Sequence, residues 1–221
     1  MRNRELQWYQ PENALVQDGM LIIEARRESR PNPTHDPASD HWGRSRESIE
    51  YTSSSLTTRG LHSWRYGRFE MRARIDVRPG MWPAFWALGT SGGWPANGEI
   101  DIMEYYRGMI LANVAWAKED RHTAFWDDVK VPLSDFPAGW ADDFHLWRMD
   151  WTPEAIELYV DEQLLNRTEL SETVNHDGRN PFHEPMYLIV NLAVGGNNGG
   201  DPSGTNFPGR YEIDYVRVYQ R

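Results

Sequence analysis

The stretch SWRYGRFEMRARIDV, residues 63–77, alternates charged and apolar side chains through its central part. The charged residues are Arg68, Glu70, Arg72 and Arg74, and the apolar residues that alternate with them are Phe69, Met71, Ala73 and Ile75. Successive side chains of a β-strand point to opposite faces, so this period of two predicts a strand. One face of the strand belongs to the core, and the charged face meets water or a polar cleft.

Four further stretches have the same strand-like character, with alternating polarity and many Ile, Val, Tyr and Phe residues. They cover residues 20–28, 154–165, 186–194 and 210–220. No segment of comparable length has the period of an amphipathic helix, and Gly and Pro interrupt the strands throughout. We therefore expect an all-β fold, a β-jelly-roll sandwich of two stacked antiparallel sheets.

Length and composition limit the class of protein. The chain has 221 residues, which suffices for one large domain, and we expect a single domain over residues 1–221. Its 11 Trp and 10 Tyr residues exceed the usual content, so the aromatic side chains form a large core, platforms for sugar rings, or both.

Charge and cysteine content exclude several functions. The formal net charge of -10 disfavours binding to nucleic acid, and no basic cluster opposes it. The absence of cysteine excludes disulfides, thiolate metal sites and a cysteine nucleophile. No apolar run approaches the roughly 20 residues that span a bilayer, so we expect no membrane segment. The polar N-terminus resembles folded-domain sequence rather than a signal peptide.

The stretch GEIDIMEYY, residues 98–106, carries three acids: Glu99, Asp101 and Glu104. A helix would spread them around its axis, and a regular strand would point Glu104 away from the other two. A β-bulge adds one residue to a strand and reverses the side-chain parity beyond it. The adjacent apolar pair Ile102 and Met103 is where alternation fails, so we predict a bulge there and all three acids on one face.

Three carboxyl groups on one face could serve catalysis or bind a metal ion. Two glutamates that lean inward can bring their carboxyl groups to about 5 Å, the separation found in retaining glycosidases. Mutual repulsion among the acids raises at least one pKa, as a general acid requires. An exposed acidic face or a hard-cation site has the same residue pattern, and the spacing alone leaves catalysis and metal binding open.

Several blocks of the chain resemble glycoside hydrolase family 16 in its laminarinase-like, bulged Glu-x-Asp-x-x-Glu form. In order, these are WRYGRFEMRARI, GMWPAFWALG, the acidic strand, FHLWRMDWTPEAIELYVD, YLIVNLAVGG and IDYVRVYQ. The resemblance implies a jelly roll with a substrate cleft on its concave face and a retaining mechanism without a catalytic cofactor. It implies Glu99 as nucleophile, Asp101 as its assisting residue and Glu104 as general acid/base.

The resemblance also suggests substrate-binding residues. Trp82 and Trp94 flank the acids and are expected to stack on sugar rings, and Trp86 either does the same or packs in the core. Arg68 and His145 match charged and histidine positions of the family, where they line the cleft or brace it. Asn191 lies among apolar residues in a predicted strand, so it binds substrate or satisfies a buried partner.

A structural metal ion is the one further ligand that the resemblance suggests. Asp214 matches the position that supplies a ligand to a structural calcium ion on the convex face of many relatives. A surface Asp in an ordinary ion pair gives the same sequence signal.

Departures from the family pattern concern the sugar. Residues 112–117 read ANVAWA without the histidine that laminarin-cleaving relatives often carry, and residues 195–204 have asparagines after the Gly-Gly pair instead of tryptophan. Two long polar stretches, 29–48 and 174–185, are expected to be loops with functional roles. The wall that contacts the sugar is therefore expected to differ from that of laminarinases.

These observations predict a retaining endo-hydrolase that cleaves a polysaccharide, with a β-1,3-glucan such as laminarin or a mixed-linkage glucan as the leading substrate. A β-galactanase acting on β-1,3-galactan or a red-algal galactan, a transglycosylase and a non-catalytic carbohydrate-binding protein are the alternatives. Polysaccharides do not cross membranes, so we expect the protein to work in the periplasm, at the cell surface or as a secreted protein. We also expect a monomer.

Overall fold

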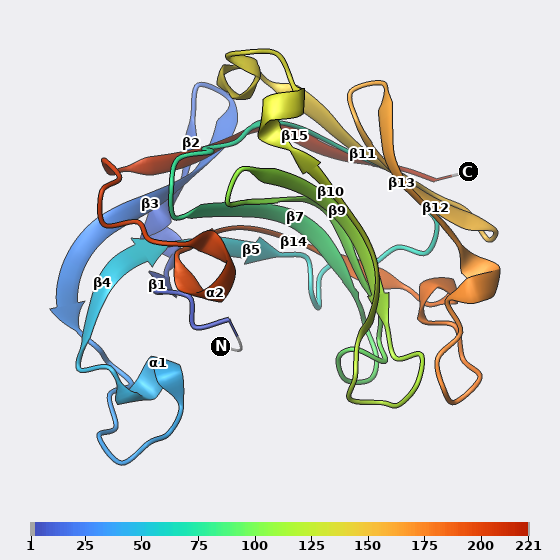
Figure 1. Ribbon diagram of the computed structural model, residues 1–221, viewed down its shortest axis with the longest axis horizontal. Coiled ribbons are helices and arrows are strands. Elements are labelled where there is room, and N and C mark those ends of the chain that lie inside the picture. Colours follow the sequence, from blue (N-terminus) through green and yellow to red (C-terminus); the bar gives the residue numbers. More distant parts are fainter. Residues whose placement is uncertain (1–2, 221) are drawn as a thin grey trace.

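A computed structural model describes residues 3–220 of the protein, which consist mainly of β-strands in two stacked sheets (Figure 1). Helical segments are one turn long; they are α1 (Trp42–Ser45), α2 (Gly196–Gly199), and the 3₁₀ turns η1 (Pro11–Asn13), η2 (Leu133–Asp135), η3 (Trp140–Asp142), η4 (Leu170–Glu172) and η5 (Pro181–His183). Within residues 3–220, no helix is long and apolar enough to cross a membrane.

The larger sheet has nine strands in the order β1-β4-β3-β15-β6-β11-β12-β13, and β2 pairs with β3 beside this path. Their bounds are β1 (Gln7–Tyr9), β2 (Ala14–Gln17), β3 (Met20–Pro31), β4 (Ser48–Ser53), β6 (Gly67–Arg74), β11 (His145–Trp151), β12 (Ala155–Val160), β13 (Gln163–Glu169) and β15 (Gly209–Tyr219). Neighbouring strands are antiparallel except for the parallel pair β1 and β4.

The smaller sheet has six strands in the order β10-β9-β8-β7-β14-β5, all antiparallel. Their bounds are β5 (Ser55–Thr57), β7 (Met81–Gly89), β8 (Glu99–Tyr106), β9 (Met109–Trp116), β10 (Phe125–Pro132) and β14 (Met186–Val194). In Figure 1 this sheet lies beneath the larger one, and its open side carries α1, α2 and the N-terminal segment at one end. The expected sandwich of two stacked antiparallel sheets is confirmed.

Strand β6 shows how the alternating sequence builds the sandwich. Phe69, Met71 and Ala73 are buried between the sheets, as the period of two predicts. The charged residues of β6 lie on the outer face of the nine-stranded sheet. There Arg68 pairs with Asp150 on β11 at 2.7 Å. The charged face of this strand therefore meets water and not a polar cleft.

One of the expected strands is in fact a hairpin. Residues 154–165 form β12 and the start of β13, which pair with each other. Asp161 turns the chain with a left-handed backbone (φ 50), a conformation that Asp tolerates better than most residues. The sequence alternates on both sides of this turn, which is why the stretch has the appearance of one long strand.

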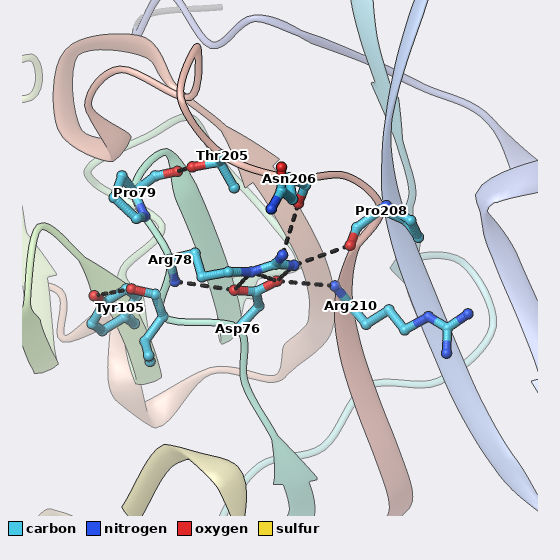
Figure 2. Close-up of polar contacts among 9 residues, drawn as sticks. Asp76, Arg78, Pro79, Tyr105, Thr205, Asn206, Pro208 and Arg210 are labelled. Carbon is cyan, nitrogen blue, oxygen red and sulfur yellow. Dashed lines mark hydrogen bonds and ion pairs between the residues drawn. The ribbon is translucent and has the colours of Figure 1, made fainter. Parts of the chain in front are cut away.

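The connection from β6 to β7 is fixed to the segment before β15, as Figure 2 shows. Arg78 forms an ion pair with Asp76 and donates to the carbonyl oxygens of Asn206 (2.7 Å) and Pro208 (3.0 Å). Thr205 Oγ1 donates to Pro79 O at 2.6 Å. The network fixes the segment that follows α2, at the end of the six-stranded sheet where the N-terminal segment lies.

Candidate active site

The predicted bulge lies in β8. Asp101 pairs with Asn113 on β9 and Glu104 pairs with Leu111, so Ile102 and Met103 together oppose a single residue of β9. The register to β7 shifts at the same place. Ile102 and Met103 are fully buried, and Glu99, Asp101 and Glu104 line one cavity. The parity argument for the bulge is confirmed.

Strand pairing explains which other side chains meet the acids. Directly paired residues of antiparallel strands share a face, so they form rows across the concave side of the six-stranded sheet. These rows are Leu88, Glu99, Ala115 and Trp126; Trp86, Asp101, Asn113 and Asp128; and Ala84, Glu104, Leu111 and Lys130. The rows supply most of the wall of a cavity of about 680 Å³ that the three acids line. The other lining residues are Asn3, Trp82, Trp94, Tyr106 and Asn198.

Two tryptophans hold the two glutamates. Trp82 Nε1 donates to Glu104 Oε1 at 2.6 Å, and Trp94 Nε1 donates to Glu99 Oε2 at 2.5 Å. Trp82 also packs edge-on against Tyr106, with ring centroids 5.6 Å apart. Both indoles therefore orient a carboxylate. Their stacking on sugar rings stays a prediction.

The acids perturb one another because they are close and largely shielded from water. Burial, followed by the negative charges of Glu99 and Glu104, raises the pKa of Asp101 well above its usual value. Burial and the charge of Glu99 raise the pKa of Glu104 to about 7, against the opposing hydrogen bond from Trp82. Glu104 can therefore hold a proton near neutral pH, as a general acid must. The raised pKa that the sequence predicted is confirmed.

Asn191 and Trp86 lie beside the acids but are bonded to each other. Trp86 Nε1 donates to Asn191 Oδ1 at 2.7 Å, and Asn191 Nδ2 donates to the hydroxyl of Tyr9 at 3.0 Å. Both ends of the Asn191 amide are thus engaged within the protein. Of the two roles considered for Asn191, the structure favours the satisfied buried partner, whereas Trp86 still lines the cavity.

Two residues that the family resemblance suggested do not reach this cavity. Arg68 lies on the outer face of the other sheet in its pair with Asp150. His145 also lies in the nine-stranded sheet, on β11, where its ring stacks on Trp140 at 3.7 Å. Its nitrogens lie 2.7 Å from Trp140 O and 2.8 Å from Asp161 Oδ2. Of the two roles considered for Arg68 and His145, the structure contradicts lining of the cleft and supports bracing of the scaffold.

Asp214 lies on β15, on the outer face of the nine-stranded sheet. Its carboxylate accepts from Arg72 Nη1 at 2.8 Å, so it has a cationic partner instead of a set of oxygen ligands. Across residues 3–220, no group of three or more His, Cys, Asp or Glu side chains could hold a metal ion. A structural calcium ion held by Asp214 and backbone carbonyl groups therefore stays a prediction.

Several cavity residues were not identified from the sequence. Strand β10 contributes Trp126, Asp128 and Lys130, whose alternating positions are the signal that could have identified them. Trp126 lies with its ring centroid 6.4 Å from that of Trp94. Glu5 and Tyr9 line the end of the cleft nearest the N-terminal segment. The sequence did not identify Glu5 and Tyr9 as cavity residues because they lie far from the acids along the chain.

Comparisons with known proteins agree with this geometry. The family model for glycosyl hydrolases family 16 matches residues 3–217. The chain is 40% identical to a beta-glucanase of Rhodothermus marinus, over 99% of this chain and 75% of that protein.

Solved structures are similar over the whole chain. A laminarinase catalytic domain from Thermotoga maritima MSB8 superposes with a TM-score of 0.81 at 35% identity, covering 100% of this chain and 85% of that one. A structure from work on endo-acting O-glycanases of the human gut microbiota that initiate mucin breakdown has a TM-score of 0.89 at 33% identity, covering 100% and 82%. The jelly-roll class expected from the sequence is confirmed by these neighbours.

Proposed function

The chain belongs to glycosyl hydrolases family 16 and is a glycoside hydrolase, and from that premise we propose that it cleaves internal β-1,3 linkages of a glucan with retention of configuration. Laminarin or a mixed-linkage β-glucan is the proposed substrate. We assign Glu99 as nucleophile, Glu104 as general acid/base and Asp101 as the residue that assists Glu99.

One observation carries the mechanism: a bulge places two glutamates on one face of β8, on either side of the buried Asp101. Glu104 has a pKa of about 7, which is suited to donating a proton and then accepting one. Trp94 donates a hydrogen bond to Glu99 at 2.5 Å, which orients the carboxylate that would attack the anomeric carbon. Trp82 donates to Glu104 in the same way, so it is burial and the charge of Glu99 that raise the pKa of Glu104 and support its proposed role as acid/base.

The reaction then proceeds in two displacements. In the first, Glu104 gives its proton to the glycosidic oxygen while a Glu99 carboxylate oxygen bonds to the anomeric carbon, and the bond from that carbon to the leaving oxygen breaks. In the second, Glu104 takes a proton from water, the water oxygen bonds to the anomeric carbon, and the bond to Glu99 breaks. Two inversions return the original configuration.

Asp101 acts through Glu99. Burial, then the negative charges of Glu99 and Glu104, and finally a hydrogen bond with Glu99 raise the pKa of Asp101 and favour its protonated form. A neutral Asp101 can donate to Glu99 without adding charge next to the nucleophile. We propose that this bond orients Glu99 and limits the repulsion that three charged acids would cause.

The substrate assignment rests on the relatives. A beta-glucanase and a laminarinase domain are similar to this chain over almost its entire length. The high TM-score of the structure from the O-glycanase work supports a second candidate, endo-hydrolysis of a mucin O-glycan. The same carboxylate chemistry serves both substrates.

A panel of glycans with sizing of the products tests these assignments. Laminarin, a mixed-linkage β-glucan, β-1,3-galactan, a red-algal galactan and mucin O-glycans are each incubated with the wild-type protein and with Glu99→Gln. Short oligosaccharides from laminarin that disappear with Glu99→Gln are expected. Release only from a galactan or mucin would overturn the glucan assignment, and hydrolysis that persists in Glu99→Gln would exclude the proposed nucleophile.

Proton NMR of the earliest products tests the stereochemistry. Retention predicts that the β-anomer of the new reducing end appears first and then equilibrates. Initial appearance of the α-anomer would contradict the double displacement.

We also propose that residues 1–221 act as a single catalytic domain and as a monomer. We propose further that the protein works outside the cytoplasm, because a polysaccharide substrate cannot cross a membrane. Sedimentation of the pure protein and fractionation of the producing cells test this. A stable dimer or an exclusively cytoplasmic protein would contradict it.

A further inference from the structure

The N-terminal segment, residues 3–9, brings a fourth carboxylate to the cleft. A cavity of about 170 Å³ at this end of the site is lined by Glu5 together with Glu99, Asp101 and Glu104. Glu5 is half-buried and lies far from the other three acids in sequence. The proposed mechanism gives Glu5 no role, so its presence beside the reacting groups requires another explanation.

Hydrogen bonds to distant parts of the chain hold this segment in place. Leu6 N donates to Val194 O at 2.8 Å, and Asn197 N donates to Asn3 O at 2.7 Å. From the other side, Trp42 Nε1 donates to Glu5 O at 3.3 Å. The backbone of Glu5 is thereby fixed between the segment that follows β14 and the loop that contains α1.

The Gly-Gly pair at 195–196 makes this close approach possible. Gly196 has a left-handed backbone (φ +72), and a Cβ atom there would lie 2.5 Å from Asn3 O and 2.9 Å from Glu5 N. A Cβ atom on Gly195 would lie 2.6 Å from Leu6 Cδ1. Any larger residue at 196 must push the N-terminal segment away. These two glycines are therefore part of what places Glu5 at the cleft.

The Glu5 side chain is held by a neutral partner. Gln7 Nε2 donates to Glu5 Oε2 at 2.8 Å. No Lys, Arg or His among residues 3–220 forms an ion pair with it. A carboxylate has several acceptor positions, so one bond from Gln7 leaves capacity for further donors.

We infer that Glu5 is a specificity-determining residue of the proposed hydrolase, whose carboxylate accepts hydrogen bonds from the hydroxyl groups of an uncharged sugar unit beside Trp82 and Trp86. Sugar hydroxyls are donors, and hydrogen bonds to a charged acceptor are stronger than neutral ones. Trp86, which is partly exposed and lines the same cavity, offers apolar surface for the C–H face of the ring. This inference rests on the proposed function and narrows its substrate class.

Charge gives the site a selectivity of its own. Glu5 faces a cavity that already contains three acids, and no Lys or Arg of residues 3–220 lines it. A sulfate or carboxylate group on the sugar unit bound there would be repelled by Glu5. The structure thus favours a glycan that is unsubstituted by acidic groups next to the cleaved bond.

Glu5 also acts on the general acid at a distance. After burial and the charge of Glu99, the charge of Glu5 raises the pKa of Glu104. Loss of this charge would lower the pKa of Glu104 and move the alkaline limit of activity to lower pH. A purely structural role for Glu5 would not produce this shift.

Steady-state kinetics of Glu5→Ala and Glu5→Gln test the inference. The probe is laminarihexaose if the panel selects a glucan, or a desulfated and unsialylated O-glycan oligosaccharide if it selects mucin. Glu5→Ala is expected to raise KM about tenfold or more while kcat changes by only a few fold. Glu5→Gln keeps an acceptor for Gln7 and is expected to raise KM less, to lower the alkaline limit of kcat/KM, and to discriminate less against a sulfated oligosaccharide.

The matched control is Glu12→Gln, which changes an exposed glutamate of η1 and should leave KM and the pH profile unchanged. An unchanged KM in Glu5→Ala, with the wild type active, would overturn the role of Glu5 and leave the proposed function intact. A loss of thermal stability in Glu5→Ala, with Glu5→Gln identical to wild type in KM and pH profile, would show a structural role only. A wild type inactive on every glycan would contradict both proposals.

Discussion

The outer face of the nine-stranded sheet and the concave face of the six-stranded sheet treat their acidic residues in opposite ways. On the outer face, carboxylates are paired with arginines, as Asp150 is with Arg68 and Asp214 is with Arg72. On the concave face, the acids lie together, no arginine lines their cavity among residues 3–220, and indole N–H groups hold the two glutamates.

The difference separates charges that belong to the scaffold from charges that belong to the reaction. Exposed ion pairs contribute little to stability. Clustered and buried acids make the folded protein less stable, because they must either stay protonated or repel one another as charged groups. Proteins keep such a destabilising cluster where a function needs a shifted pKa, and the pKa of Glu104 is shifted in this way.

Carboxylate-to-amide substitutions in the two faces give the largest expected contrast. Glu104→Gln removes the group that transfers protons, so kcat should fall by about 10²–10⁴-fold. Asp150→Asn changes the same chemical group on the outer face and should keep kcat within about twofold of wild type, because it does not contact the cavity. Initial rates on the active glycan check both. Comparable losses in the two variants would remove the distinction between the faces.

The same two substitutions should change stability in opposite directions. The pKa of Glu104 is raised to about 7 in the folded protein, above the value of 4.5 for an unperturbed Glu, so the folded state binds the extra proton between these pH values. Burial of this acid therefore costs no stability below about pH 4.5 and costs most above about pH 7. Glu104→Gln should raise the free energy of unfolding by about 1–3 kcal/mol at pH 8 and leave it almost unchanged at pH 4.

Asp150→Asn is the matched control for this stability measurement. Loss of its pair with Arg68 should lower the free energy of unfolding by at most about 1 kcal/mol at pH 8. Chemical denaturation of both variants and the wild type at pH 4 and pH 8 gives the comparison. A destabilised Glu104→Gln at pH 8 would show that the acidic cluster stabilises the fold.

Trp82→Phe sharpens the role of the indole on the concave face. The Trp82 N–H favours the charged form of Glu104 and lowers its pKa. Without it, the pKa of Glu104 should rise above about 7, and the alkaline limit of kcat/KM should move to higher pH by roughly half a unit to one unit. Trp126→Phe is the control, because Trp126 lines the cavity from β10. Equal shifts in both variants would contradict the specific bond.

The smallest expected effect is that of Asp214→Asn on stability, and this variant also tests whether Asp214 on the outer face binds calcium. An exposed pair with Arg72 predicts a loss of at most about 0.5 kcal/mol and no dependence of Tm on added calcium. Thermal melts of wild type and Asp214→Asn, each with calcium chloride and with a chelator, make the measurement. A calcium-dependent rise of Tm that Asp214→Asn abolishes would instead identify Asp214 as a calcium ligand.

The sequence predicted the local features of the site because these depend on chain parity. The failure of alternation at Ile102 and Met103 locates the bulge, and the three acids share a face as a direct consequence. The same parity reasoning placed Phe69 and Met71 in the core. Properties that depend on neighbours within one strand were therefore accessible.

Features that depend on the assembly of the sheets were not accessible. Alternation shows that Arg68 points away from the core, but only the strand order places β6 in the nine-stranded sheet, far from the cleft. The bond from Trp82 to Glu104 depends on how an indole turns in its packed site. Glu5 reaches the acids only because the Gly-Gly pair at 195–196 admits the N-terminal segment.

The assignment of Glu99 as nucleophile and Glu104 as acid/base is the central claim, and trapping of the covalent intermediate tests it most directly. A 2-deoxy-2-fluoro β-glycoside of the active sugar, which forms the intermediate faster than water releases it, is incubated with the protein. Peptide mass spectrometry then locates the added sugar mass. The mechanism predicts that one sugar is attached to Glu99. A sugar attached to Glu104 would contradict it, and so would turnover that gives inverted products and no adduct.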